Sequence, residues 1–164
     1  MFVYPISLLI CMLLVYMDFE RSVALTAAAL TFAAPACTDT FAYFGGTLLG
    51  KHKLCPAISP KKTVEGAVAG LIGGVAFGAL LIPLQKLWDG VVDAPYLLVI
   101  GLICGVCAQF GDLFASLLKR WAGVKDFSSI FPEHGGIMDR IDSILLCAPV
   151  VLCLFTILRL LGIY

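Results

Sequence analysis

The chain has 164 residues, of which 61 % are apolar and only 13 % are charged. A typical soluble domain has about 45–50 % apolar and about 25 % charged residues, so too few charges are present here to cover a soluble core. The same numbers exclude a disordered chain. Eleven basic and eleven acidic residues cancel, so no basic surface indicates a nucleic-acid partner. The composition therefore predicts an integral membrane protein.

Five apolar stretches approach or reach the roughly 20 residues that a membrane-spanning helix needs. They are residues 1–17, 22–50, 66–85, 94–118 and 143–158. The first lacks the basic start of a cleaved signal peptide, so we expect it to be retained. The second is long enough for a helix plus a structured re-entry. We predict an all-α integral membrane protein with about five transmembrane helices, organised as a single transmembrane domain over residues 1–164.

The seven cysteines do not predict a disulfide framework. All but Cys55 lie in apolar stretches, and the pair Cys104 and Cys107 has redox-motif spacing without a histidine or a second pair nearby. We interpret the cysteines as small packing residues and expect no zinc site.

The charges of the connecting segments predict an orientation. Residues 51–62 and 119–140 each contain four lysines or arginines, whereas 18–21 and 86–93 each contain one. With five spans, these two pairs of segments fall on opposite sides of the membrane. The positive-inside rule then places the first pair, and the N-terminus, in the cytoplasm.

Carboxylates within or beside the spans gather toward the basic side, where a polar site is expected at the cytoplasmic face. They are Asp39, Glu65, Asp112, Asp139 and Asp142. A charge inside a bilayer costs several kcal/mol, so each one calls for an explanation. Oxygen ligands on facing helices suit Mg²⁺, and nearby basic side chains suit phosphates. The alternative is a set of ion pairs and helix-end charges that only fix the topology.

Helical spacing brings Asp112, Ser116 and Lys119 within roughly 60° of one another on the fourth span. The segment that follows, 119–136, lacks helical periodicity, and its diglycine allows a ligand to approach the backbone closely. Directly after Gly136 we expect a helix whose N-terminal amides favour an anion. His134 lies beside this point, and either a structural or a functional role fits it.

Three blocks of sequence resemble the phosphatidate cytidylyltransferase (CDP-diacylglycerol synthase) family. The longest spans 27 residues, from Ser116 to Asp142, and includes Lys119-Arg120, Lys125-Asp126, His134-Gly135-Gly136 and Asp139-Arg140. The second runs from Asp39 through Tyr43, Gly46 and Gly50-Lys51 to Ser59-Pro60-Lys61-Lys62-Thr63 and Glu65-Gly66. The third is Gly111-Asp112. Together they lie within residues 38–142, which would be the catalytic half of the family.

The resemblance implies a Mg²⁺-dependent transfer of a cytidylyl group from CTP to phosphatidate in the membrane, with release of pyrophosphate. It implies metal ligands at Asp112 and Asp139, with Asp142 as a third ligand or as a residue that orients the others. Asp39 and Glu65 would hold a second cation or position basic residues. Phosphates would be bound by Lys119, Arg120, Lys125 and Arg140, reached from the other basic segment by Lys51 and Lys62. Asp126 and His134 would shape the nucleotide pocket, with Ser116, Gly135 and Gly136 as further substrate-binding residues.

Two other functions remain as alternatives. A CTP-dependent polyprenol-type lipid kinase would transfer the γ-phosphate and release CDP. An ion-coupled transporter would place its carboxylates near the bilayer midplane and show inverted repeats, whereas here the charges lie toward one face. An inactive remnant is a third reading.

Members of the family commonly have additional N-terminal spans, so we expect this chain to correspond to the catalytic half. Glycines spaced four apart in the third span, such as Gly66 and Gly70, allow close helix contact within one chain or in a homodimer.

Overall fold

The structure, a computed structural model, describes residues 3–56, 58–123 and 138–164, and the side chains of residues 3–5, 7, 8, 12 and 138–142 lie outside that description. Its elements, in chain order, are α1 (Val3–Met17), α2 (Arg21–Leu49), β1 (Lys53–Cys55), β2 (Ser59–Thr63), α3 (Val64–Leu84), the 3₁₀ helix η1 (Gln85–Trp88), α4 (Ala94–Trp121) and α5 (Met138–Leu160). Five long helices correspond to the five apolar stretches, which confirms the predicted all-α membrane class. The one addition is an antiparallel hairpin, β1–β2, where the sequence predicted only a basic connecting segment.

Four helices of the described chain are long and apolar enough to cross a membrane, by length and composition: α2, α3 together with η1, α4, and α5 from residue 143 onward. Helix α1 has 15 residues, or about 22 Å at 1.5 Å per residue, which is less than the roughly 30 Å of a bilayer core. The described part of α1 is therefore shorter than a helix that crosses the membrane.

The prediction that the second apolar stretch contains a helix plus a structured re-entry is wrong. Helix α2 is continuous over 29 residues and carries Asp39 in its C-terminal half, inside the helix rather than beyond it. Pro35 lies within the helix and lacks the N–H that would bond one turn back. The helix continues past it. The hydroxyls of Thr31 and Thr38 donate hydrogen bonds to backbone carbonyls one turn earlier.

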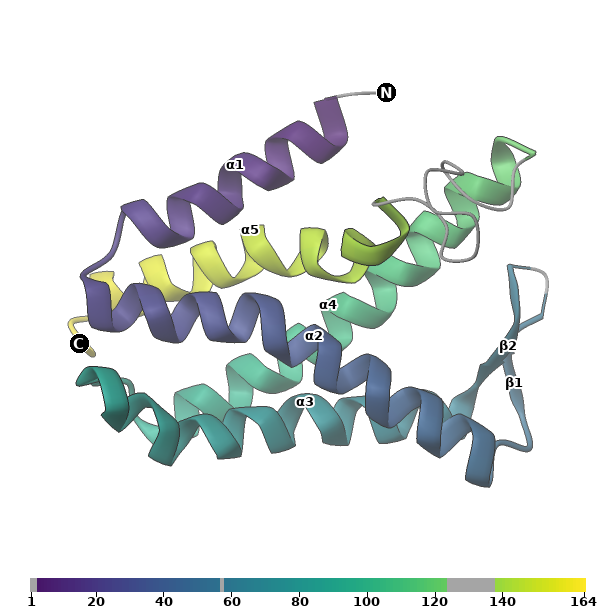
Figure 1. Ribbon diagram of the computed structural model, residues 1–164, viewed down its shortest axis with the longest axis horizontal. Helices are drawn as coiled ribbons and strands as arrows, with labels where there is room; N and C mark the ends of the chain where they lie inside the picture. Colours follow the sequence, from purple (N-terminus) through teal and green to yellow (C-terminus); the bar gives the residue numbers. More distant parts are fainter. Residues whose placement is uncertain (1–2, 57, 124–137) are drawn as a thin grey trace.

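The connecting segments lie at two opposite ends of the helix bundle (Figure 1). The hairpin and the C-terminal end of α4 lie at one end, to the right in the view, and the N-terminus lies toward the same end. The α1–α2 connection, η1 and the C-terminus lie at the other end. The hairpin and the C-terminal end of α4, which carries Lys119 and Arg120, thus lie at the same end, which we call the basic end.

Glycines allow α2, α3 and α4 to pack closely. Gly74 of α3 and Gly101 of α4 face each other so closely that a Cβ on Gly74 would lie 2.6 Å from the Gly101 carbonyl oxygen. Gly70 meets the side chain of Gln109 and Gly73 that of Phe41 in the same way. The close contacts expected of the glycine-rich span therefore lie within one chain. A homodimer through these glycines gains no support from this packing and stays a prediction.

The end opposite the hairpin is held by polar contacts among segments distant in sequence. Arg159 donates from Nη1 to the Asp18 carbonyl at 2.9 Å and lies 5.4 Å above the Phe19 ring. Trp88 donates its indole N–H to Thr26 at 2.9 Å. All seven cysteines are free thiols; Cys104 and Cys147 are buried, and Cys153 is exposed.

Candidate functional site

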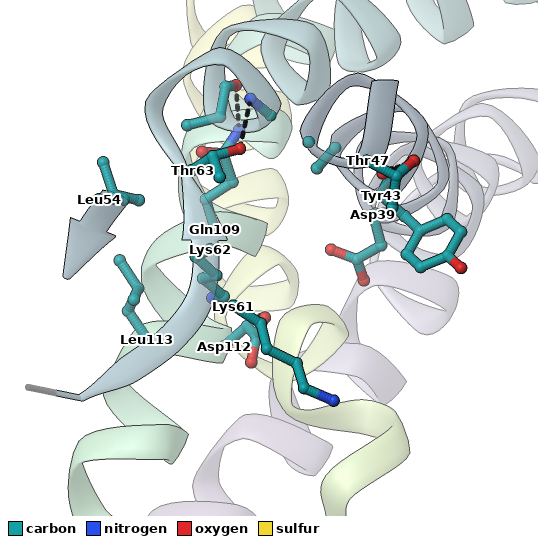
Figure 2. A pocket seen from close by; sticks show the side chains of 14 residues that line it. Asp39, Tyr43, Thr47, Leu54, Lys61, Lys62, Thr63, Gln109, Asp112 and Leu113 are labelled. Atoms are coloured by element: carbon teal, nitrogen blue, oxygen red, sulfur yellow. Dashed lines mark hydrogen bonds and ion pairs between the residues drawn. The ribbon is translucent and has the colours of Figure 1, made fainter. Parts of the chain in front are cut away.

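A polar pocket opens at the basic end, between α2, the hairpin, the start of α3, and α4 (Figure 2). Its volume is about 260 Å³. Charged or polar side chains from α2, the hairpin and α4 line it: Asp39, Tyr43, Thr47, Lys61, Lys62, Thr63, Gln109 and Asp112. Apolar or small residues complete the wall: Ala42, Gly46, Leu54, Gly66, Ala67 and Leu113. Two acidic and two basic side chains thus meet in one pocket within a protein that is mostly apolar.

The central contact of the pocket is an ion pair between strand β2 and helix α4. Lys62 Nζ lies 2.6 Å from Asp112 Oδ2. The side chains are 24 % and 34 % exposed, so water reaches both only in part. At this distance the ammonium is a charge-assisted donor to the carboxylate. The pair joins a residue of the hairpin to one 50 positions later in the chain.

Helix α2 forms the opposite wall. Asp39, Tyr43 and Thr47 are spaced four apart, so they follow one face of the helix. Figure 2 shows the Asp39 side chain extending from α2 toward the region occupied by Lys61 and Asp112. The sequence block that contains Asp39 and Tyr43 is thereby explained as one wall of the pocket.

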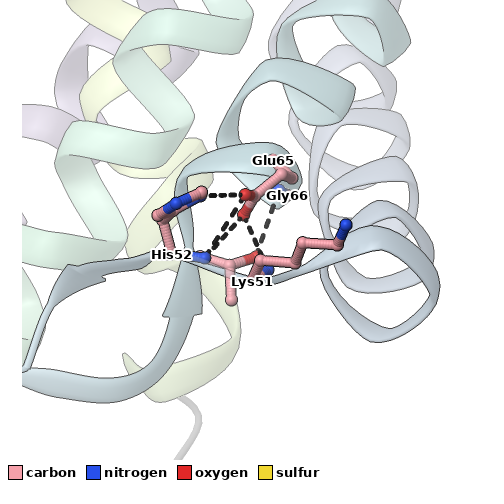
Figure 3. A network of polar contacts seen from close by, with 5 residues as sticks. Lys51, His52, Glu65 and Gly66 are labelled. Carbon is pink, nitrogen blue, oxygen red and sulfur yellow. Dashed lines mark hydrogen bonds and ion pairs between the residues drawn. The ribbon is translucent and has the colours of Figure 1, made fainter.

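The hairpin that carries both lysines is held at its base by Glu65 (Figure 3). The Glu65 carboxylate accepts the backbone N–H of Lys51 at 3.1 Å and that of His52 at 3.2 Å. His52 Nδ1 lies 2.7 Å from the same carboxylate. In addition, the N–H of Val64 donates to the His52 carbonyl at 2.9 Å. These contacts connect the beginning of the hairpin to the beginning of α3.

Thr63 joins the hairpin to helix α3. Its Oγ1 accepts the N–H of Gly66 at 3.1 Å and so caps the helix N-terminus. Since Thr63 directly follows Lys62 and is only 8 % exposed, the backbone beside the lysine is held by both the hairpin and the helix.

Two contacts hold α4 against the other elements of the pocket. Gln109 donates from Nε2 to the Ala67 carbonyl of α3 at 2.9 Å, one turn before Asp112. Near the end of α4, Arg120 Nε lies 3.4 Å from the carbonyl of Ile58 in the hairpin turn. The hairpin is therefore held at its base by Glu65 and contacted at its turn by Arg120.

The structure brings three of the predicted site residues into the pocket lining, Asp39, Lys62 and Asp112. Glu65 and Lys51 meet at the hairpin base, where Glu65 binds backbone amides. These contacts bear on the second of its two predicted roles, positioning basic residues rather than holding a cation, and both roles stay predictions. Ser116, Lys119 and Arg120 follow Asp112 along α4 but are not in the lining of this pocket.

Several predicted site residues, or their side chains, lie outside the part of the chain that the structure describes. Lys125, Asp126, His134, Gly135 and Gly136 lie outside the described residues. Asp139, Arg140 and Asp142 lie in the first turns of α5, but their side chains lie outside the description. Their roles stay predictions.

The sequence analysis missed Gln109 and did not assign Tyr43, Thr47 or Lys61 a role in the site. Gln109 is a lone amide in an apolar span, three residues before a predicted ligand, and that spacing was a usable signal. Tyr43 and Thr47 could have been found from their four-residue spacing after Asp39.

The residues present are compatible with a divalent cation. Mg²⁺ is commonly held by one or two carboxylates together with phosphate oxygens and waters, and Asp39 and Asp112 supply two carboxylates to the pocket. Among the side chains that the structure describes, no group of three or more His, Cys, Asp or Glu is placed to hold a metal by itself.

Comparison with known proteins assigns the chain to a protein family. A sequence model described as the Cytidylyltransferase family matches residues 1–158. A phosphatidate cytidylyltransferase of Staphylococcus saprophyticus is 44 % identical over 138 residues, which is 83 % of this chain and 51 % of that protein. Proteins of the same name from Staphylococcus aureus (strain COL) and Aquifex aeolicus are each 46 % identical, over 116 and 112 residues. These alignments cover 70 % and 68 % of this chain, and 43 % and 40 % of the relatives. The chain thus spans about half the length, or less, of these curated relatives.

Proposed function

Because the chain belongs to the cytidylyltransferase family, we propose that it transfers the cytidylyl group of CTP to phosphatidate, giving CDP-diacylglycerol and pyrophosphate. The observation that carries the proposal is the pocket in which Asp39, Lys61, Lys62 and Asp112 meet at the basic end of a membrane-embedded helix bundle. The names of the aligned relatives support the same reaction. Such a pocket suits a reaction between a charged nucleotide and a lipid phosphate.

In this reaction an oxygen of the phosphatidate phosphate attacks the α-phosphorus of CTP. A new P–O bond forms there, and the bond from the α-phosphorus to the oxygen that bridges to the β-phosphate breaks. Pyrophosphate leaves with that electron pair. The protein has little covalent chemistry to do, so its contribution is to position two anionic groups in line and to stabilise the charge that develops.

The lysines of the pocket are proposed to bind phosphate oxygens. Lys61 and Lys62 are on the same strand, which the Glu65 contacts hold near α2 and α4. Each ammonium is a compact cation on a flexible stem, suited to follow a phosphate group through the reaction. The further basic residues Lys51, Lys119, Arg120, Lys125 and Arg140 are proposed to bind the remaining phosphates of nucleotide and lipid. Ser116, Gly135 and Gly136 would complete the substrate site, with Asp126 and His134 shaping the nucleotide pocket.

Mg²⁺ is proposed as the cofactor, with Asp112, Asp139 and Asp142 as its ligands and Asp39 placed to hold a second cation. When bound, the ion would neutralise phosphate charge and polarise a phosphoryl oxygen. The pocket residues would hold the reacting groups together and limit the access of water.

The basic end is proposed to face the cytoplasm, where CTP is found. The support is the excess of lysine and arginine in residues 51–62 and 119–140 over the segments at the other end. In that orientation CTP enters from the aqueous side, while phosphatidate stays in the bilayer.

A double-label experiment tests the reaction. The chain is incubated in detergent–lipid micelles with phosphatidate, Mg²⁺ and CTP labelled at either the α- or the γ-phosphate. The proposal predicts α-label in the lipid product and γ-label in pyrophosphate. Appearance of γ-label in lipid when a polyprenol is supplied would instead identify a lipid kinase.

A further inference from the structure

The ion pair between Lys62 and Asp112 presents a conflict with the proposed role of Asp112. When the Asp112 oxygen that accepts the ammonium at 2.6 Å also binds a divalent cation, the two positive charges repel each other at short range. Lys62 therefore leaves Oδ2 of Asp112 when a cation is bound there.

The backbone around Lys62 is held by its neighbours, whereas its side chain is held by the ion pair with Asp112. Thr63, the next residue, caps α3, and the hairpin pairs Lys53 with Thr63. On the other side of the pair, Gln109 fixes α4 to α3 one turn before Asp112. Movement is thus expected in the four rotatable bonds of the lysine rather than in either element.

We propose that Lys62 is an internal counter-cation that exchanges with the metal. Without a divalent cation, its ammonium neutralises Asp112. When the cation binds, the ammonium is displaced but stays in the pocket because its backbone is held, and it takes a phosphate oxygen of the nucleotide as its new partner. This inference rests on the proposed function for Asp112 as a metal ligand and for the identity of that phosphate ligand.

The exchange has a thermodynamic consequence. A cation that binds alone must break the ion pair and leave Lys62 without its carboxylate partner, so its affinity is reduced. A cation that binds with nucleotide supplies a phosphate for Lys62, so cation and nucleotide favour each other's binding to the same extent. The exchange therefore disfavours binding of a metal ion in the absence of nucleotide.

Lys61 provides a matched control. It is the neighbouring residue on β2, lines the same pocket and carries the same charge. Among the ion pairs found within the described residues, that of Asp112 is with Lys62 and not with Lys61. Removing either lysine changes the net charge of the pocket equally, but only the Lys62 substitution removes the competing ammonium.

The test measures binding of Mn²⁺, as a probe for Mg²⁺, to the full chain in detergent without nucleotide, from the electron paramagnetic resonance signal of free Mn²⁺. We expect Lys62→Gln to bind Mn²⁺ about fivefold more tightly than wild type, the upper end of the change expected for loss of one partly screened ion pair. Lys61→Gln should stay within about twofold of wild type. At saturating Mg²⁺, Lys62→Gln should also raise KM for CTP.

Equal Mn²⁺ affinity in Lys62→Gln and Lys61→Gln would overturn the inference, as would weaker binding in Lys62→Gln. Thermal melting checks that each variant folds, and Lys62→Met provides a second removal of the charge with a straight side chain. Failure of wild type to transfer α-label would count against the proposed function, while the Mn²⁺ comparison would still decide whether Lys62 competes for Asp112.

Discussion

The carboxylate of Glu65 lies 2.7 Å from Nδ1 of His52 and also accepts the backbone N–H groups of Lys51 and His52. One side chain at the start of α3 thus fixes the chain where it enters the hairpin. Because the hairpin carries Lys61 and Lys62 into the pocket, we propose Glu65 as a positioning residue for those two cations.

Glu65→Gln should lower transfer activity roughly tenfold or more, because small displacements of groups that bind reacting phosphates reduce rates steeply. The neutral amide is a weaker acceptor for three donors, so the hairpin base loosens. His52→Ala is the matched comparison, since it removes one donor and leaves both backbone contacts. Steady-state kinetics in lipid micelles measure both variants, and a larger loss in His52→Ala than in Glu65→Gln would contradict this assignment.

Helix packing gives a second prediction. Gly74→Ala should destabilise the protein by about 1–3 kcal/mol, the usual cost of overpacking, because the new methyl group would meet the Gly101 carbonyl at 2.6 Å. Gly105→Ala, on the facing helix, should cost less, since the nearest atom to its Cβ is the Thr38 hydroxyl oxygen at 3.3 Å. Thermal unfolding in one detergent compares the two. Equal melting temperatures would show that α3 and α4 are not packed through Gly74.

The orientation of the bundle is tested with a membrane-impermeant maleimide. Cys55 lies in the hairpin at the basic end, and Leu161, which is 68 % exposed, lies just beyond α5 at the other end. In intact cells that express the chain, Leu161→Cys should be labelled, whereas labelling that depends on Cys55 should appear only after permeabilisation. Cys55→Ala identifies the signal that belongs to Cys55. The reverse pattern would place the pocket outside the cell.

The helices were predictable because the membrane imposes a length on uncharged sequence. Apolar runs such as 66–85 and 94–118 correspond to α3 and α4 within a few residues. The position of Lys62 and Asp112 at one end of the bundle followed from the same count of charges and spans. The helix positions and the end at which each charge lies can therefore be read from the sequence of each segment alone.

The hairpin was not predictable by the same reasoning. Its strands have three and five residues, and β2 includes Pro60, which is typical of loops and strand edges. Pairing depends on contacts with Glu65 and Thr63, which belong to the next helix boundary and cannot be recognised from local pattern. The continuity of α2 was not predicted either, because length alone does not distinguish one 29-residue helix from a shorter span followed by a re-entry.

The central claim is that the pocket at the basic end, with Asp112 in its wall, is where the cytidylyl group is transferred. The measurement that tests it most directly is transfer of α-label from CTP to phosphatidate by Asp112→Asn and by Asp18→Asn, which removes an acidic charge at the opposite end. We predict at least about a hundredfold loss in Asp112→Asn, as for removal of a group that stabilises transition-state charge, and activity near wild type in Asp18→Asn. Near-normal transfer by a folded, membrane-inserted Asp112→Asn variant would contradict the claim and place the reaction elsewhere in the molecule.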